Sequence, residues 1–205
     1  MIGKERKESM RPTKNPARCG WRIVCIGILI LVMNTVSLAK EFSGVNFADQ
    51  VTIGQQTCKL VGVGMRKKFV VDVYCGVLYM TQPTQDPQQV IAAEQPKRVL
   101  LHVVYKQVEP HQWVEGWQEG FAKNTPSPDA ALKDKIDQFL KCFTETVKKG
   151  QEVQITYVPD KGTEVMVNQQ VKATILGSDF MKALWSIWFG KQPASESLMK
   201  GMLGK

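Results

Sequence analysis

The sequence predicts an α+β fold in which an antiparallel β-sheet is backed by a layer of helices. Runs rich in β-branched and aromatic residues follow one another over 55–105, with one short helical segment among them, and again over 152–176. Longer segments with helical spacing are grouped between and after these runs, over 110–150 and 178–204. Grouped strands and grouped helices form separate layers, whereas a parallel sheet requires alternating βαβ units.

The composition is that of one globular domain with a short appendage. The chain has 205 residues, of which 43% are apolar and 22% charged, which suffices for one sizeable core and excludes a disordered chain. The formal net charge is +8, but seven basic and two acidic side chains within residues 1–39 hold +5 of it, which leaves +3 on residues 40–205. So small a charge on the main part of the chain is no electrostatic footprint for nucleic acid.

Residues 1–39 have the three parts of a cleavable secretory signal peptide. A basic stretch ends at Arg22, an apolar run covers 23–33, and Ser37 and Ala39 supply small residues at the −3 and −1 positions. The apolar run would rise about 16 Å as a helix, roughly half of a hydrocarbon core. We therefore expect cleavage after Ala39, a mature domain over 40–205 without a membrane span, and a periplasmic or secreted location. An uncleaved N-terminal anchor is the alternative.

The first part of the predicted sheet is a hairpin followed by a short helix and a further strand. Asp86 and Pro87 identify the start of the helix, as N-cap and first-turn residue. The predicted elements are, in order, strands over 55–64 and 68–80 around a charged turn at 66–68, a helix over 88–94 and a strand over 98–105.

The predicted hairpin has a consequence for the cysteines. A turn centred between Arg66 and Lys67 places Cys58 opposite Cys75, within reach of a disulfide. Burial of both thiols, together with Cys142, as small hydrophobic side chains is the alternative. No Cys/His spacing typical of zinc sites occurs, so no structural metal is expected.

Two amphipathic helices are predicted between the two groups of strands. The first covers 110–123 and carries Trp113 and Trp117 on one apolar face. The second has the clearest pattern, because Ser127 supplies an N-cap, apolar residues recur at helical spacing, and two lysines precede Gly150 at the C-terminal end. The remaining predicted elements are strands over 152–158, 163–167 and 171–176, a helix capped by Ser178 or Asp179, and a last helix after Pro193.

The chain contains no motif of a common catalytic class, such as a nucleophile elbow, a phosphate loop or a zinc-protease helix. His102 is expected to be a structural residue of a strand, and His111 a solvated residue at a helix start. Arg66 differs, because it follows Gly62 and Gly64 and could point into a cavity between sheet and helices. A guanidinium in such a cavity would pair with a carboxylate or an oxyanion. A solvated turn residue beside two lysines is the alternative.

Four segments resemble one protein family in their order and spacing: Leu60-Val-Gly-Val-Gly-Met-Arg66, Val73-Tyr-Cys-Gly-Val-Leu-Tyr79, Tyr157-Val-Pro-Asp-Lys-Gly-Thr163 and Ile187-Trp-Phe-Gly-Lys-Gln-Pro193. The chain is similar to the chalcone isomerase-like family over about residues 42–204, and more to its exported bacterial branch than to the plant flavonoid enzymes. The resemblance implies an open-faced β-sandwich, an antiparallel sheet backed by a layer of helices, with a ligand cleft between them.

The resemblance also implies which residues form the site. In the plant isomerases a cleft arginine binds the ligand, and Arg66 matches its position. The polar trio of the catalytic helix is replaced here by Trp113, Gly116 and Gly120, and Ile187 stands near a catalytic threonine position. Because donors that orient the reacting phenolate are absent, no catalytic residue is assigned and chalcone cyclisation is not expected.

Relatives that retain the arginine without the catalytic set include fatty-acid-binding proteins, in which a nearby tyrosine helps to hold the carboxylate. Tyr79 is the candidate tyrosine here, and Trp113 and Trp117 are candidate pocket residues. The resemblance therefore implies an exported, non-catalytic protein that binds a small apolar or amphiphilic ligand with an anionic end. The ligand would be fatty acid-like or haem-like, and a haem would use His102 or His111 as axial ligand. An intramolecular lyase or isomerase with a rearranged site is the alternative.

Overall fold

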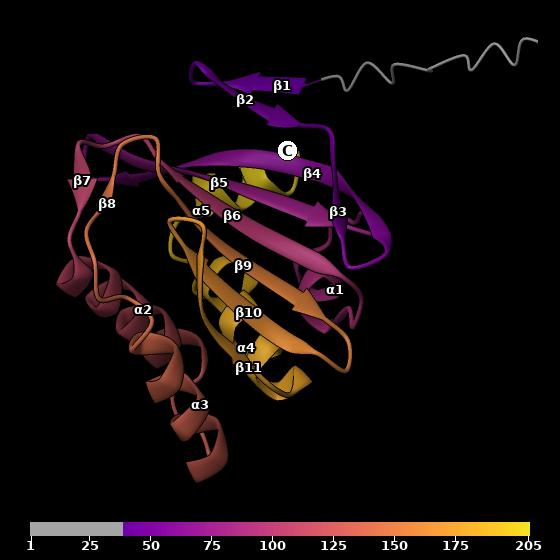
Figure 1. Cartoon of the computed structure of the whole chain (residues 1–205), viewed down its shortest axis with the longest axis vertical. Coiled ribbons are helices and arrows are strands. Elements are labelled where there is room, and N and C mark those ends of the chain that lie inside the picture. The colour runs from indigo at the N-terminus through magenta and orange to yellow at the C-terminus, as the bar shows by residue number, and fades with distance from the viewer. Residues whose placement is uncertain (1–38) are drawn as a thin grey trace, which may run out of the picture. The chain divides into compact units, whose positions relative to one another are not determined.

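The computed structural model describes residues 39–205, and it confirms the α+β fold class (Figure 1). The predicted signal peptide, apart from its last residue Ala39, lies outside the described residues. Its cleavage therefore stays a prediction. The strands are β1 (Ala39–Phe42), β2 (Val45–Ala48), β3 (Gln50–Ile53), β4 (Gln56–Lys68), β5 (Val71–Met80), β6 (Lys97–Val103), β7 (Gln107–Val108), β8 (Val147–Lys148), β9 (Glu152–Val158), β10 (Gly162–Val167) and β11 (Gln170–Ile175). The helices are α1 (Pro87–Ala92), α2 (Pro110–Asn124), α3 (Ala130–Leu140), α4 (Ser178–Phe189) and α5 (Glu196–Met202).

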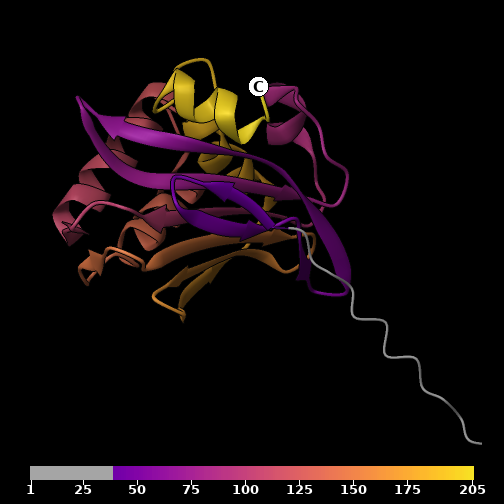
Figure 2. The same cartoon turned by 90° about the horizontal axis from the view of Figure 1, so that it is seen from above.

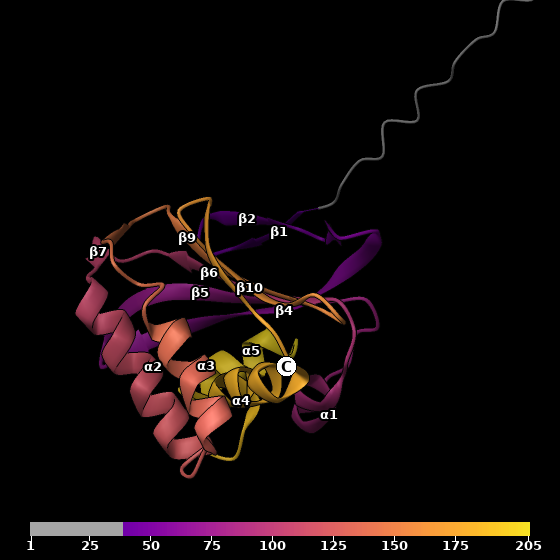
Figure 3. The same ribbon diagram turned by 60° about the horizontal axis from the view of Figure 1, so that its bottom comes forward.

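The central element is a seven-stranded antiparallel sheet in the order β11-β10-β9-β6-β5-β4-β3. The five helices lie on one face of this sheet, and the β1–β2 hairpin lies on the other (Figure 3). The turn between β4 and β5 projects at one end of the sheet (Figure 2). None of the helices formed by residues 39–205 is long and apolar enough to cross a membrane.

Two hydrophobic clusters fill the space on either side of the sheet. The larger cluster lies between sheet and helices, and its largest fully buried side chains include Trp185, Trp188 and Phe139. The smaller cluster lies on the other face, where Phe47 of the β1–β2 hairpin covers Tyr79 and its neighbours. Because the described residues form one compact unit with a hydrophobic cluster on each face of its sheet, we expect residues 39–205 to fold on their own.

The β4–β5 hairpin turns later in the chain than the sequence predicts. The strands pair up to Lys68 and Val71, so the turn consists of Phe69 and Val70 and not of residues 66–68. In this register Cys75 lies opposite Met65, while Cys58 pairs with the neighbouring strand β3. The disulfide is therefore ruled out by the register, and Cys58, Cys75 and Cys142 are all free and buried, as in the alternative interpretation.

The second amphipathic helix is shorter than its periodic pattern predicts. Helix α3 is capped by Asp129, whose carboxylate accepts the amide of Leu132 at 2.8 Å, and not by Ser127. Helix α3 ends at Leu140. The apolar residues that continue the helical pattern, Phe143 and Val147, are also buried, but they belong to segments that are not helical. Phe143 packs against Trp117 at 5.5 Å between ring centroids, and Val147 pairs with β7. Tertiary contacts outweigh local helix propensity over these residues.

Helix α5 packs directly on the backbone of β4. A Cβ atom added to Gly64 would overlap the carbonyl oxygen of Leu198, and one added to Gly62 would overlap that of Gly201. Gly201 itself would place a Cβ 2.5 Å from the Cα of Gly64. The two glycines of β4 therefore serve helix–strand contact, since any side chain would force the two backbones apart.

Lys97 is a fully buried cation between α1, α4 and the sheet. Its Nζ donates to the carbonyl oxygens of Val90 at 2.6 Å and Ile91 at 3.3 Å, in the last turn of α1, and lies 5.2 Å from the ring centroid of Trp185. Burial lowers the pKa of Lys97 to about 7; the charge of Lys182 lowers it further, and that of Glu94 opposes the shift. Its neutral amine is therefore populated in the folded state near neutral pH.

Lys97 makes the stability of the fold depend on pH in the alkaline range. Between about pH 7 and the ordinary lysine value of 10.5, the unfolded chain holds a proton on Lys97 that the folded chain has lost. The free energy of unfolding of the wild type should therefore rise with pH relative to that of Lys97→Met, with a slope approaching about 1.4 kcal/mol per pH unit. Urea unfolding of both proteins across this window measures the slope. A difference that does not change with pH would contradict the assignment.

Candidate functional site

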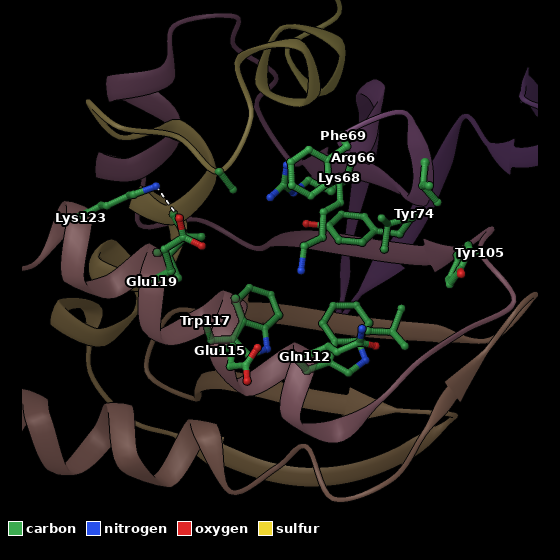
Figure 4. Close-up of a pocket in the computed structure, with 18 of the residues that line it drawn as sticks. Arg66, Lys68, Phe69, Tyr74, Tyr105, Gln112, Glu115, Trp117, Glu119 and Lys123 are labelled. Atoms are coloured by element: carbon green, nitrogen blue, oxygen red, sulfur yellow. Dashed lines mark hydrogen bonds and ion pairs between the residues drawn. The ribbon is translucent and has the colours of Figure 1, made fainter.

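A cavity of about 390 Å³ lies between the outer half of the β4–β5 hairpin and helix α2 (Figure 4). The hairpin lines it with residues from Arg66 to Tyr74, and α2 lines it from Gln112 to Lys123. Ile187 of α4 contributes on the side of the core, and Tyr105, from the loop between β6 and β7, contributes at the end of the sheet. The cavity therefore opens at the end of the molecule where the hairpin turns.

The inner wall of the cavity is aromatic. The ring of Tyr74 stacks on Trp113 with centroids 5.8 Å apart, and Trp113 stacks on Trp117 at 5.9 Å. Trp117 in turn meets the edge of Trp188 at 5.5 Å. The side chains of Tyr74, Trp113 and Trp117 are nearly buried, so the wall is fixed by packing and not by ligand. Such a wall accepts an apolar molecule without rearrangement.

Two cations from the hairpin stand at the polar side of the cavity. Arg66 and Lys68 both line it, and Lys68 extends into the space between hairpin and α2 (Figure 4). Arg66 donates from Nη1 to its neighbour's carbonyl, that of Lys67, at 2.7 Å. Within residues 39–205 neither cation forms an ion pair with a carboxylate. Both keep donors available for an anionic group.

Two carboxylates, Glu115 and Glu119, lie on the opposite wall, and one of them is paired. Glu119 accepts a hydrogen bond from Lys123 at 2.6 Å, and this bond, with the charge of Lys123, lowers the pKa of Glu119. The charges of Arg66 and Lys68, on the facing hairpin, also lower the pKa of Glu119, to a smaller extent. Burial raises the pKa of Tyr74 despite the opposing charge of Arg66, so its phenol stays protonated at neutral pH.

The alternation of side chains along β4 separates Arg66 and Lys68 from Lys67, the cation between them. Lys67 is not a cavity residue; its Nζ pairs with Asp72 at 3.2 Å on the other side of the hairpin. Successive side chains of an extended strand point to opposite faces, so Arg66 and Lys68 share one face and Lys67 takes the other. The extension of β4 beyond residue 66 thus places two cations in the cavity, where a turn would have left them in solvent.

The two glycines of α2 have different surroundings. A Cβ added to Gly120 would lie 2.6 Å from Cγ2 of Ile187, so this glycine permits the close approach of α2 and α4. A Cβ added to Gly116 meets no atom within 4 Å, because it would point into the cavity. Gly116 therefore leaves open a volume that any larger residue would occupy.

The structure brings three of the four predicted ligand-binding residues together. Arg66, Trp113 and Trp117 line one cavity, whereas Tyr79 does not. The hydroxyl of Tyr79 donates to the carbonyl of Ala48 at 3.0 Å, in the cluster on the opposite face of the sheet. The tyrosine beside Arg66 is Tyr74, which faces Arg66 directly in the β4–β5 register. The sequence could have identified Tyr74 in place of Tyr79. The two residues are an odd number of positions apart in one strand, so their side chains must lie on opposite faces of the sheet.

Neither histidine reaches the cavity. His102 lies on the other face of the sheet, where its Nδ1 is 3.1 Å from Glu152 and its ring meets the edge of Phe47. His111 is exposed at the start of α2 and is not a cavity residue. Residues 39–205 also contain no group of three metal-binding side chains. The residues present therefore do not fit a haem, the second of the two ligand types considered from the sequence, because it would need one of these imidazoles as axial ligand.

Comparison with known proteins agrees with this architecture. The model of the family described as chalcone isomerase-like matches residues 39–204, and the chain belongs to that family. Among solved structures, a fatty-acid binding protein of Arabidopsis thaliana is similar, with a TM-score of 0.63 and 15% sequence identity over 81% of this chain and 96% of that one. At this identity the likeness shows the shared fold. A search of curated proteins gave no match.

The environments of the two glycines predict opposite effects of the same substitution. Gly120→Ala should destabilise the fold by about 1–3 kcal/mol, because the new methyl group collides with Ile187. Gly116→Ala should raise the free energy of unfolding by up to about 1 kcal/mol, because alanine favours the helix and meets no neighbour. Urea unfolding of the two variants measures both effects, and effects of equal sign would contradict the packing described.

Proposed function

We propose that this protein binds an apolar ligand with an anionic end, such as a fatty acid, in the cavity between the β4–β5 hairpin and α2. The observation that carries the proposal is the combination of two cations without carboxylate partners and an aromatic wall in one preformed cavity. An apolar chain against Trp113 and Trp117 would leave water, while the anionic end meets Arg66 and Lys68.

The dimensions and the neighbouring protein support this ligand class. The cavity volume of about 390 Å³ lies within the range of about 300–1,000 Å³ typical of small-molecule sites. The structural neighbour is described as a fatty-acid binding protein. The protonated phenol of Tyr74, beside Arg66, offers one further donor to a carboxylate.

The first test removes the arginine. Arg66→Ala should weaken binding of palmitate about tenfold, or about 1.4 kcal/mol, because a charge-assisted bond is lost while Lys68 remains. The effect is moderate because the guanidinium is half-exposed and partly screened. Lys67→Ala is the matched control, since it removes a neighbouring cation of the same hairpin that faces away from the cavity. Calorimetric titration gives both affinities. Equal losses of affinity in the two variants would show that the effect comes from the net charge of the hairpin and not from Arg66 in the cavity.

A second variant tests occupancy of the cavity itself. Gly116→Leu should fill part of the open volume and abolish palmitate binding, whereas Gly116→Ala should bind nearly as the wild type does. Both substitutions favour the helix, so a thermal melt should show both variants folded. Unchanged binding in Gly116→Leu would place the ligand elsewhere.

Chalcone cyclisation is not expected from this cavity. The positions of the catalytic polar trio are occupied by Trp113, Gly116 and Gly120, which all line the cavity. The glycines have no side chain, and the indole of Trp113 offers one N–H donor in place of the three polar groups. Incubation of the protein with a 2′-hydroxychalcone should therefore give no enantioselective acceleration over buffer. A large stereospecific acceleration would favour the alternative, an intramolecular lyase or isomerase with a rearranged site.

We also propose that the protein is exported, as in an exported branch of the family. The support is the basic, apolar and small-residue pattern that ends at Ala39. Mass spectrometry of protein from the native host should find Lys40 as the N-terminal residue, in the periplasm or the medium. Recovery of the full-length chain from the cytosol would contradict export.

A further inference from the structure

The turn of the β4–β5 hairpin carries two fully exposed apolar side chains. Phe69 is 92% exposed and Val70 is 91% exposed, more than any other large hydrophobic residue of the described chain. We call these two residues the hairpin tip. The turn projects at one end of the sheet (Figure 2), so the tip can reach a surface that the remainder of the domain does not touch.

Local stability does not explain these residues. Phe69 has a φ of +56°, in the left-handed region that favours glycine and that a bulky side chain rarely adopts. Two-residue hairpin turns whose first residue has a positive φ take glycine or asparagine at that position. A phenylalanine there costs both backbone strain and exposed apolar area, and such violations of local rules occur at functional positions.

Cations flank the tip in β4 and in the neighbouring loops. Arg66, Lys67 and Lys68 precede it in β4, and Asp72, the nearby acidic residue of the hairpin, pairs with Lys67. The neighbouring loops add exposed lysines, because Tyr105 bonds back to Val73 through its amide at 3.1 Å and the loop before β9 bonds to residue 106. We call the cations at this end the basic rim: Arg66, Lys67, Lys68, Lys106, Lys148 and Lys149.

The tip and the cavity are continuous. Phe69 and Lys68 line the mouth of the cavity from the hairpin, and Tyr105, which is 46% exposed, lines it from the next loop (Figure 4). An object that covers the tip would therefore cover the entrance to the cavity as well. An exposed apolar pair with three cations beside it in β4 and lysines in the neighbouring loops matches the headgroup region of an anionic bilayer, where apolar insertion and electrostatic attraction add.

We propose that the hairpin tip and the basic rim dock this protein on an anionic lipid bilayer, with Phe69 and Val70 inserted between the headgroups. In this position the mouth of the cavity faces the bilayer, and an amphiphilic ligand passes between membrane and cavity without crossing water. The exchange step rests on the proposed function, whereas the docking itself does not.

The test uses residues 39–205, which contain both hydrophobic clusters, and vesicles of phosphatidylcholine with or without phosphatidylglycerol. The protein should sediment with the phosphatidylglycerol vesicles, and less at high salt, which screens the basic rim. Val70→Asp should reduce this partitioning at least about tenfold, because it removes an inserted side chain and repels the anionic surface. Leu176→Asp is the matched control, since Leu176 is 64% exposed just after the other edge strand, β11.

Val70 does not line the cavity, so Val70→Asp should bind palmitate in solution as the wild type does. Transfer of a fluorescent fatty acid from vesicles to the wild type should accelerate with vesicle concentration, and this dependence should be lost in Val70→Asp. If no protein binds palmitate in solution, the proposed function fails while vesicle sedimentation still measures docking.

Three results would overturn the docking proposal. The first is absence of sedimentation with anionic vesicles. The second is equal sedimentation of the wild type, Val70→Asp and Leu176→Asp, which would place any contact elsewhere. The third is a wild-type dimer in sedimentation velocity that Val70→Asp abolishes, which would assign the tip to contact between copies of the chain.

Discussion

The contact between Gly120 of α2 and Ile187 of α4 is the constraint on which the cavity depends. Without a side chain at residue 120 the two helices approach closely, and α4 is itself fixed beneath the sheet by Trp185 and Trp188. One turn earlier, α2 rests on the sheet through Trp117 and Trp113, whose indoles hold its backbone a ring's width away from Tyr74. Helix α2 thus lies close to α4 near Gly120, and near Trp113 it is held away from the β4–β5 hairpin. The space between α2 and the hairpin is the cavity. Gly116, placed where that space opens, preserves its volume because it adds no side chain.

The β4–β5 hairpin contributes to three separate parts of the structure: the contact with α5, the cavity and the exposed turn. Its inner part presents Gly62 and Gly64 to α5, which packs on bare backbone there. Farther out, Arg66 and Lys68 stay on the helix side of the sheet and enter the cavity, while Lys67 turns away. At the end of the strand the alternation stops, and Phe69 and Val70 are exposed. The close contact between the backbones of β4 and α5 fixes the inner part of the hairpin, and this packing positions the two cations although neither pairs with a carboxylate among the described residues.

Sequence reasoning predicts this fold well where local signals and tertiary contacts agree. The strand over 152–158 and the helix that starts at Pro110 lie where the pattern places them. It fails where packing overrides a local pattern, as after Leu140, where Phe143 leaves the helix to join the aromatic wall. The site follows the same rule. Arg66, Trp113 and Trp117 line one cavity, whereas the choice of tyrosine depends on the strand register. The charged segment 66–68 has the composition of a turn although it belongs to a strand. The three N-terminal strands were not predicted, because four-residue runs without strong alternation give no signal above that of loops.

The features that support binding differ from those that a chemical step would need. In the proposed complex, Arg66 and Lys68 stabilise a full negative charge from the moment the ligand is bound, and the phenol of Tyr74 stays protonated because it is buried. An interaction equally strong in the bound ligand and in a transition state improves affinity without lowering the barrier of a chemical step. A catalyst would need a group that takes up or orients charge only as the reaction proceeds, and at the positions of the family's polar trio this chain has Gly116, Gly120 and Trp113. The same two glycines that create and preserve the volume of the cavity therefore supply no side chain to such a step, which is why the proposed function is one of binding.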